Sequence, residues 1–248
     1  MLITSKDNLQ IKEAAALKDK KARLDQSRYL IEGYRCVKDS LRYLNNPTIF
    51  MSETAYSRYA GEFDGFKLLV CADKVFSKIT DTDNSQGVVC VADITKKSPD
   101  YENRYALFLD RVRDPGNLGT IIRTALAVGF NDIYCYDCVD AYNPKVVRSA
   151  MSAISRVNLF DSGLDELYAL KQNGYKVFCA DMNGKSVFSE KVKSDKICLV
   201  IGNEANGVLD EITEISDEIV SLPMNGVESL NAAVSASVLM YQIVFGTK

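Results

Sequence analysis

A short Gly- and Asn-rich segment, residues 202–207, contains a single carboxylate, Glu204, and directly follows an apolar run at residues 198–201. This pattern is typical of a buried strand that opens into a ligand-binding loop. The chain contains no histidine, which excludes Ser-His-Asp and Cys-His catalysis, an imidazole base and His-ligated metal sites. Any chemistry must therefore use carboxylates, Arg, Lys, Cys, Tyr, Ser and backbone dipoles, or a cofactor that is already activated.

A second loop and a strongly apolar helix follow this segment. The apolar run at residues 219–222 ends at Pro223, and the loop leads to Ser229, a residue type that commonly caps a helix N-terminus. From Leu230 to Phe245 apolar residues occupy every side of a helical wheel, which predicts a helix that is buried all round. The segment is too short and too interrupted by hydroxyls for a membrane span, which needs about 18 or more apolar residues.

Composition sets the broad class. The 248 residues suffice for one large or two ordinary domains, and 47% hydrophobic with 25% charged residues is typical of a soluble globular protein. No signal sequence follows Met1, so we expect a cytoplasmic protein that does not associate with membranes. Seven scattered cysteines indicate reduced thiols. Cys135 and Cys138 form one CxxC in an apolar run without a second pair, so we expect structural thiols and no metal site.

The elements that must position these loops follow a regular order. From Tyr105 onward, strand and helix patterns alternate, which predicts an α/β fold with a mostly parallel sheet and helices on both faces. The expected strands cover residues 106–109, 132–136, 156–160, 175–179, 197–201 and 218–222. The expected helices cover residues 118–128, 144–151 and 164–172, in addition to the last segment.

The N-terminal part is expected to form a separate domain. Residues 1–94 alternate shorter helix and strand patterns, and the polar segment 95–103 is typical of an interdomain linker, so the second domain should cover 104–248. A net charge of −3 argues against a protein that coats nucleic acid indiscriminately. Residues 1–43, however, contain ten Lys and Arg against six Asp and Glu. These cations are together a candidate RNA-facing surface, although each alone is more often part of a solvated helix face.

Three segments resemble, in the same order, the motifs of the SpoU (TrmH-like) RNA 2′-O-ribose methyltransferases of the SPOUT superfamily. The first is Asp114-Pro115-Gly116-Asn117-Leu118-Gly119-Thr120-Ile121-Ile122-Arg123-Thr124-Ala125. The second is Ile201-Gly202-Asn203-Glu204-Ala205-Asn206-Gly207, and the third combines Leu222-Pro223-Met224-Asn225-Gly226 with Ser229-Leu230-Asn231. Three ordered motifs are a specific signal, whereas any one alone is weak. Residues 27–35 also resemble the start of the family's N-terminal substrate-binding domain, which has an L30e-like fold.

The resemblance implies an S-adenosylmethionine-dependent enzyme that methylates a ribose 2′-hydroxyl in structured RNA, with ribosomal RNA favoured over transfer RNA. It also implies a homodimer through the C-terminal domain and a C-terminal trefoil knot, in which the last helix passes through a preceding loop. The implied cofactor-binding residues, mainly through their backbone, are Ala180, Asp181, Gly202, Asn203, Leu222, Met224 and Leu230. The implied catalytic residues are Asn117, Arg123, Glu204, Ser229 and Asn231.

Several alternatives stay open at this stage. The family often assigns the base role to the arginine that matches Arg123, but a guanidinium stays protonated far above neutral pH, which favours alkoxide stabilisation and phosphate anchoring. Outside the motif, Arg123 would be a helix-surface ion pair and Ser229 a simple N-cap. Ala205 and Ser152 stand where many relatives have Gly, so the local shape of these loops, and with it the substrate, could differ from that of the relatives.

Two other protein classes compete with the methyltransferase interpretation. The first is a catalytically inactive RNA-binding module of the same fold, against which the complete set of Asn117, Arg123, Glu204 and Asn231 counts. The second is a Rossmann oxidoreductase, which the sequence disfavours because the glycines after residues 107–110 do not follow the GxGxxG spacing.

Overall fold

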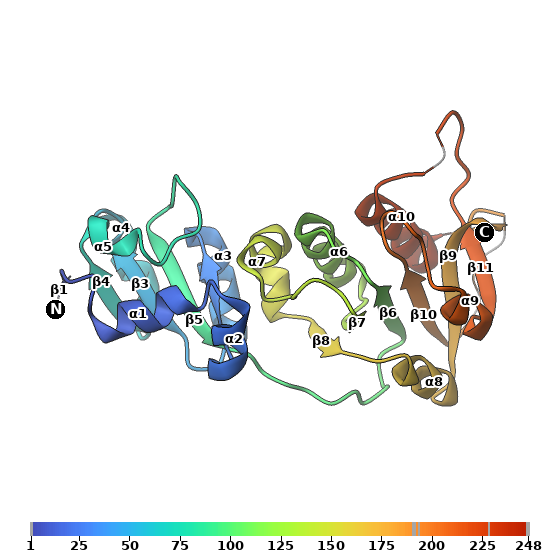
Figure 1. Cartoon of the computed structure of the whole chain (residues 1–248), viewed down its shortest axis with the longest axis horizontal. Coiled ribbons are helices and arrows are strands. Elements are labelled where there is room, and N and C mark those ends of the chain that lie inside the picture. The colour runs from blue at the N-terminus through green and yellow to red at the C-terminus, as the bar shows by residue number, and fades with distance from the viewer. Residues whose placement is uncertain (1, 190–191, 193, 228, 247–248) are drawn as a thin grey trace. The chain divides into compact units, whose positions relative to one another are not determined.

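The computed structural model describes residues 2–189, 192, 194–227 and 229–246. Figure 1 shows its helices and strands in chain order. They form two compact units: Met1–Thr95 together with Tyr142–Ser155, and Lys96–Ala141 together with Arg156–Lys248. The sequence predicted two contiguous domains, whereas the first unit of the structure contains a segment from between two strands of the second. Nothing in the local pattern of residues 142–155 distinguishes a helix that covers one sheet from a helix that covers the other.

The first unit is built on a five-stranded mixed sheet in the order β1-β4-β3-β5-β2. β5 runs antiparallel to β2 and β3, while β4 runs parallel to β1 and β3. The strands are β1 (Leu2–Ile3), β2 (Arg28–Glu32), β3 (Thr48–Ser52), β4 (Lys67–Cys71) and β5 (Val88–Asp93). The α-helices are α1 (Leu9–Ala16), α2 (Lys20–Gln26), α3 (Tyr34–Ser40), α4 (Glu53–Tyr59), α5 (Asp73–Phe76) and α7 (Pro144–Ala150), and the 3-10 helices are η1 (Leu41–Tyr43), η2 (Ala60–Phe63) and η3 (Met151–Ser155).

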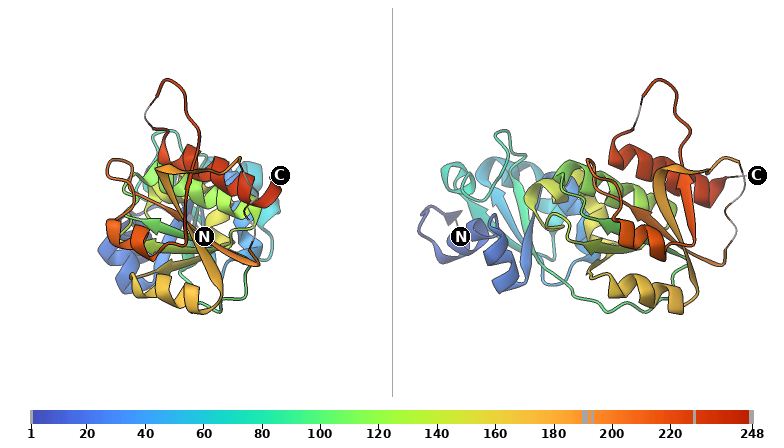
Figure 2. Two further views of the ribbon diagram at one scale, coloured as in Figure 1. Left: turned by 90° about the vertical axis from the view of Figure 1, so that its right-hand side faces the viewer. Right: turned by 45° about the vertical axis from the view of Figure 1, so that its right-hand side comes forward.

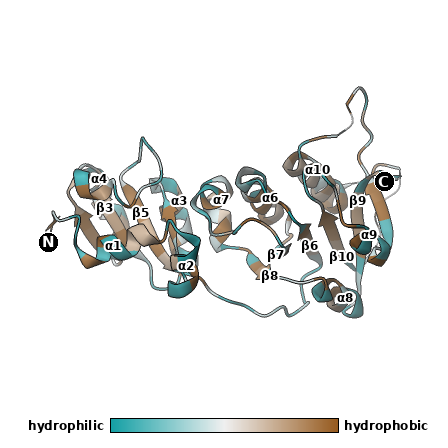
Figure 3. Ribbon diagram, viewed as in Figure 1, coloured by the Kyte–Doolittle hydropathy of each residue, from teal (hydrophilic) through white to brown (hydrophobic). Residues whose placement is uncertain are grey.

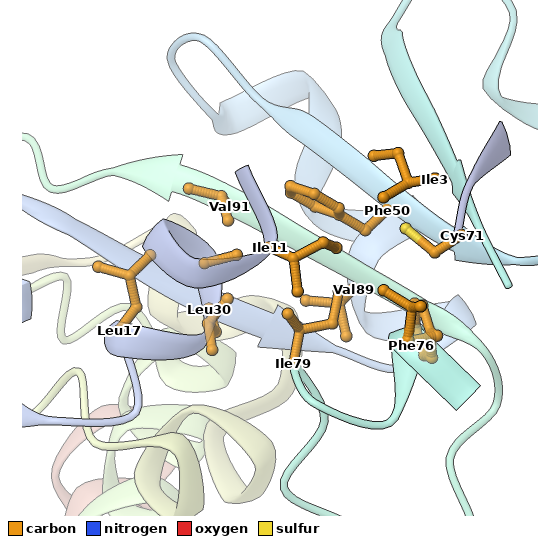
Figure 4. Packing of buried hydrophobic residues seen from close by; sticks show 12 residues of the cluster. Ile3, Ile11, Leu17, Leu30, Phe50, Cys71, Phe76, Ile79, Val89 and Val91 are labelled. Carbon is orange, nitrogen blue, oxygen red and sulfur yellow. The ribbon is translucent and has the colours of Figure 1, made fainter. Parts of the chain in front are cut away.

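One face of this sheet carries an apolar core beneath α1 and α5. Figure 4 shows Ile11 of α1 packed among Phe50, Val89 and Ile79, all of which are buried. Asn8 accepts a hydrogen bond from the backbone N–H of Gln10 at 2.9 Å and so caps α1.

The segment 142–155 completes this unit with α7 and η3. Asn143 caps α7, and Pro144 occupies its first turn. Helix α7 packs on β2 and η3 packs on α3, so that Val147 and Ile154 are buried. The ring of Tyr142 lies 4.8 Å from that of Tyr29 in β2. Apolar contacts therefore hold this segment in the first unit.

The second unit contains, within the described residues, a six-stranded sheet in the order β11-β9-β10-β6-β7-β8, with every neighbouring pair parallel. The strands are β6 (Tyr105–Asp110), β7 (Asp132–Tyr136), β8 (Asn158–Asp161), β9 (Tyr175–Ser186), β10 (Lys196–Ile201) and β11 (Glu218–Ser221). The helices are α6 (Pro115–Val128), α8 (Asp165–Gln172), α9 (Asp210–Ile215) and α10 (Ala232–Phe245). The expected parallel α/β sheet is confirmed.

Both faces of the central strands are buried, which explains their continuous apolar sequences. Phe108 and Cys198 pack with residues of α8 and α9 in one core, while Leu107 and Leu199 point to the opposite face and are equally inaccessible. On that opposite face α6 and α10 lie side by side, as Figure 1 and Figure 2 show from three directions. Figure 3 shows the resulting band of hydrophobic residues along β6 and β10. None of the described helices is long and apolar enough to cross a membrane.

Two predictions about the last helix are wrong. Its N-cap is Asn231, whose Oδ1 accepts from the backbone N–H of Ala233 at 2.9 Å, and not Ser229. The helix is also not buried all round, because Tyr241 and Phe245 are 51% and 60% exposed. A helical wheel shows that both faces are apolar but not which face finds a partner. Within one chain α6 covers only one of them.

Candidate active site

The sheet order creates a switch point between β6 and β10. From β6 the chain continues outward to β7 and β8, whereas β9 and β11 lie beyond β10 on the other side. Leu109 pairs with Ile201, so the two strands end side by side and their following loops are adjacent. Ligands of open α/β sheets bind outside the carboxyl ends of strands at such a point. Two of the three sequence motifs begin there.

The loop after β10 is a tight turn that requires glycine at its start. A Cβ on Gly202 would lie 2.3 Å from the carbonyl carbon of Gly207, a distance that no side chain tolerates. Asn203 and Gly207 exchange two backbone hydrogen bonds of 2.9 and 3.0 Å. The side chain of Asn203 accepts from the backbone N–H of Ala205 at 3.0 Å. The turn therefore projects Glu204 toward the loop that follows β6.

Glu204 joins the first and second motifs. Its Oε1 accepts from Asn117 Nδ2 at 3.0 Å and from the backbone N–H of Asp114 at 3.2 Å, and its Oε2 accepts from the backbone N–H of Arg113 at 3.3 Å. Partial burial raises the pKa of Glu204, but these hydrogen bonds outweigh it and hold the pKa below its ordinary value. The carboxylate is thus ionised and occupied by donors of its own chain, which suits a structural anchor better than a proton acceptor.

Asn231 brings the third motif to the same place. Its Nδ2 donates a hydrogen bond to Asn117 Oδ1 at 2.9 Å. Asn117 in turn donates through its own Nδ2 to Glu204. Asp114 fixes the start of α6 by accepting from the backbone N–H of Asn117 at 2.8 Å. Three of the five predicted catalytic residues therefore form one hydrogen-bonded chain across the three motifs.

The other two predicted catalytic residues lie outside this chain. Arg123 is exposed on α6 and has no hydrogen-bond or ion-pair partner among the residues that the structure describes. The helix-surface ion pair that was the alternative for Arg123 is therefore not observed there. Ser229 is exposed and lines the cavity described next.

A cavity of about 390 Å³ lies between the middle of β9, at residues 180–182, and the loops after β10 and β11. This volume is within the usual range for small-ligand sites. Its wall combines small residues, backbone groups and the apolar side chains of the third motif. All seven predicted cofactor-binding residues line it: Ala180, Asp181, Gly202, Asn203, Leu222, Met224 and Leu230. A larger cavity of about 750 Å³ lies in the first unit, but its lining contains none of the motif residues.

The two CxxC thiols lie close to the end of β6, where Cys135 is buried and Cys138 is partly buried. The hydrogen bond with Cys138, together with burial, raises the pKa of Cys135 well above its ordinary value. Cys138 Sγ in turn donates to the carbonyl oxygen of Leu109 at 3.3 Å, at the end of β6. Within the described ranges no cluster of three or more His, Cys, Asp or Glu could hold a metal ion.

A parallel α/β sheet with a ligand-sized cavity at the carboxyl end of β10, bordered by an amide–carboxylate chain, is typical of an α/β enzyme that binds a small cofactor. Comparison with known proteins gives the particular family. Residues 104–241 match the SpoU rRNA Methylase family, and residues 8–90 match the MRM3-like substrate binding domain. The chain belongs to the SpoU family.

Similarity to individual proteins extends over the whole chain. It is 32% identical, over 97% of its own length and 98% of the other, to the 23S rRNA (guanosine(2553)-2′-O)-methyltransferase RlmP of Bacillus subtilis (strain 168). The AdoMet-bound rRNA methyltransferase from Sinorhizobium meliloti superposes with a TM-score of 0.86 at 27% identity, covering 98% of this chain and 97% of that one. An RNA 2′-O ribose methyltransferase gives 0.82 at 26% identity, covering 98% of each chain.

These matches confirm the family expected from the three motifs. The chain is an S-adenosylmethionine-dependent RNA 2′-O-ribose methyltransferase. The wall of the cavity is chemically suited to this cofactor, because it combines small residues such as Ala180 and Gly202 with the apolar side chains of Leu222 and Leu230.

Proposed function

We propose that this enzyme methylates a ribose 2′-hydroxyl of ribosomal RNA. The observation that carries the proposal is the Asn231–Asn117–Glu204 chain, which joins all three motifs beside the cavity. The choice of ribosomal over transfer RNA rests on the end-to-end similarity to an enzyme named for 23S rRNA methylation.

The side chains of the site have different roles in the reaction. S-adenosylmethionine, when bound, supplies a methyl group activated by the positive sulfur. Glu204 holds the first two motif loops together, and Asn117 with Asn231 fixes the third against them. This arrangement aligns the ribose 2′-hydroxyl with the cofactor cavity, since orientation alone lowers a displacement barrier substantially. Ser229, at the cavity wall, is placed to hydrogen-bond the incoming ribose.

Arg123 stabilises the negative charge that develops on the 2′-oxygen. An exposed guanidinium without a partner in the described structure can take an RNA phosphate and a nascent alkoxide without first breaking an ion pair. A guanidinium is already protonated at neutral pH, so it cannot accept the proton of the 2′-hydroxyl. The proton of the 2′-hydroxyl leaves to the RNA phosphate or to water.

The first unit selects the RNA. Residues 8–90 match a substrate-binding domain, which supports residues 1–94 as an L30e-like RNA-binding domain, 95–103 as linker and 104–248 as methyltransferase domain. Residues 142–155 cluster with this domain, so in this proposal they belong to the RNA-selecting unit. We infer that the second unit is knotted, with α10 passing through a preceding loop. The small residues Ala233 and Ala236, both buried in α10, support this inference, because they allow other backbone to pass close to the helix.

The enzyme acts as a homodimer through its C-terminal unit. The uncovered face of α10 presents Val234, Val238, Tyr241 and Phe245, which are 49%, 37%, 51% and 60% exposed. Together with Phe188, three of these residues line an open, mostly apolar hollow of about 420 Å³. An apolar stripe of this kind on a soluble enzyme indicates a protein–protein interface.

Methyl transfer from labelled cofactor tests the substrate. Ribosomal RNA and transfer RNA from a strain that lacks the gene are offered to the purified protein in competition, and the label is mapped by mass spectrometry. We expect one 2′-O-methylated nucleotide in ribosomal RNA. Labelled transfer RNA with unlabelled ribosomal RNA would contradict the proposal, and Asn117→Asp serves as the inactive control.

A further inference from the structure

Asp110, the last residue of β6, is a fully buried carboxylate. Its Oδ1 accepts from Arg111 Nε at 2.7 Å, and its Oδ2 accepts from Arg111 Nη2 at 3.0 Å and from the backbone N–H of Leu209 at 2.9 Å. A buried charge is tolerated only when it is paired and hydrogen-bonded in this way. Leu209 lies two residues after the Asn203–Gly207 turn that contains Glu204, so Asp110 anchors the segment by which the chain leaves that turn.

Arg111 contacts the same turn at both ends. Its Nη2 donates to the carbonyl oxygen of Gly207 at 3.3 Å, and its own carbonyl oxygen accepts from Asn203 Nδ2 at 2.8 Å. The backbone of Arg111 has a φ of 55°, in the left-handed region that non-glycine residues rarely adopt. The hydrogen bond from its N–H to the carbonyl oxygen of Tyr136, 2.8 Å long, helps to hold this conformation. Such strain persists only where the surroundings over-determine it, and it is frequent at functional sites.

The pair therefore acts on the turn from behind the cofactor cavity. The cavity wall, as the described residues define it, includes residues 201–207 but neither Asp110 nor Arg111. Glu204 connects the same two loops in the opposite direction, from the turn to Arg113 and Asp114. The loops after β6 and β10 are thus joined reciprocally.

We propose that Asp110 and Arg111 are positioning residues, which hold the Asn203–Gly207 turn in its cofactor-binding geometry and so set the affinity for S-adenosylmethionine without touching it. Lysine cannot replace Arg111 in this role. A lysine presents one compact charge and lacks the fork that lets a guanidinium hold both Asp110 oxygens while reaching Gly207.

Cofactor affinity and local exchange test the pair independently of the RNA. Arg111→Lys, Arg111→Met and Asp110→Asn are compared with wild type by calorimetric titration of S-adenosylmethionine. Amide hydrogen exchange of the cofactor-free proteins is measured alongside. Arg28→Lys is the matched control, because it removes the fork from the Arg28–Asp93 ion pair (2.9 Å) of the first unit.

We expect Arg111→Lys to weaken cofactor binding about tenfold, the scale of one lost charge-assisted hydrogen bond, and Arg111→Met to weaken it more. Exchange should accelerate in residues 202–209 but not in β6 or β7, and Arg28→Lys should leave cofactor affinity within about twofold of wild type. An unchanged affinity in a folded Arg111→Lys protein overturns the proposal. Uniformly faster exchange across the second unit also overturns it, since that marks a general structural role. If Asp110→Asn fails to fold, the two Arg111 variants still decide.

Discussion

Asn231 and Asn117 lie 114 positions apart in the sequence and meet through a 2.9 Å hydrogen bond from Asn231 Nδ2 to Asn117 Oδ1. Each of the two side-chain amides makes a hydrogen bond through its Nδ2 and another through its Oδ1. Asn117 donates onward to Glu204, and the Oδ1 of Asn231 caps α10 through the backbone N–H of Ala233. A side chain with one donor and one acceptor is required at each position. The start of the last helix and the start of α6 are therefore fixed by the same two residues.

Asn117→Asp should abolish most activity while the fold persists. The substitution replaces the donor to Glu204 with a second carboxylate, and two like charges at hydrogen-bond distance repel. We expect the single-turnover rate to fall by about 10² or more, the scale of removing one well-placed donor from an active site. Asn173→Asp, at the end of α8, makes the same chemical change far from the motif loops and should retain the wild-type rate. Full activity in Asn117→Asp would contradict the role of the chain.

Substitutions of Arg123 distinguish a stabilising charge from a base. Arg123→Ala should lower turnover by about 10² to 10³, whereas Arg123→Lys should retain part of the rate as a point charge without the bidentate fork. Cofactor affinity and thermal stability should stay near wild type, because Arg123 is exposed and unpaired within the described structure. Single-turnover pH profiles are the measurement. A Lys variant whose rate rises with pH through the lysine's own titration would identify the base mechanism instead.

Local sequence patterns predicted the strands and motif loops well, because each depends on a few adjacent residues. The run at 197–201 and its Gly202 turn required only apolar periodicity and glycine spacing. The features that were missed depend on distant partners. Ser229 and Asn231 are both good caps, and the choice of Asn231 accompanies its contact with Asn117. In the same way, one face of α10 is exposed because no other element of the chain packs on it. A helical wheel shows which faces are apolar but not which of them have a packing partner.

The stability contributed by Glu204 should depend on pH. Because its folded-state pKa lies below its ordinary value of 4.5, the carboxylate stabilises the folded protein above about pH 4.5. That contribution is lost as the pH falls through the lowered folded-state pKa. Thermal unfolding of wild type and Glu204→Gln, followed from neutral to acid pH, should therefore show a difference that closes below about pH 4.5. A constant difference would contradict this assignment. Glu211→Gln, at an exposed position of α9, is the control.

Charge on the uncovered face of α10 should break the proposed dimer. Tyr241→Lys places an ammonium at the centre of the apolar stripe, where desolvation on association is unfavourable. Tyr241 is 51% exposed within one chain, so the protomer itself should fold normally. Light scattering should report half the wild-type mass and methylation should fall with it. Tyr168→Lys alters a tyrosine of similar exposure on α8 and should remain dimeric. A stable, active wild-type monomer at micromolar concentration would exclude the dimer.

Ile154→Ala should destabilise the first unit, although residue 154 lies between two strands of the second. Ile154 is 3% exposed, and such a truncation costs about 2–5 kcal/mol. Amide exchange should accelerate in residues 28–93 and remain unchanged in residues 105–136. Ile212→Ala, in the α9 core of the second unit, should give the reverse pattern. Acceleration confined to the second unit for Ile154→Ala would show that η3 belongs with its sequence neighbours.

Because residues 142–155 return to the first unit, that unit cannot complete its fold during synthesis until these residues have been made. A ribosome releases residues 1–95 first, but α7 and η3, which cover β2 and α3, do not yet exist at that moment. By the time residue 155 has been added, β6, α6 and β7 have already been made. The two units therefore mature together rather than one after the other, and a nascent chain that stalls near residue 95 exposes apolar surface that chaperones and proteases can recognise.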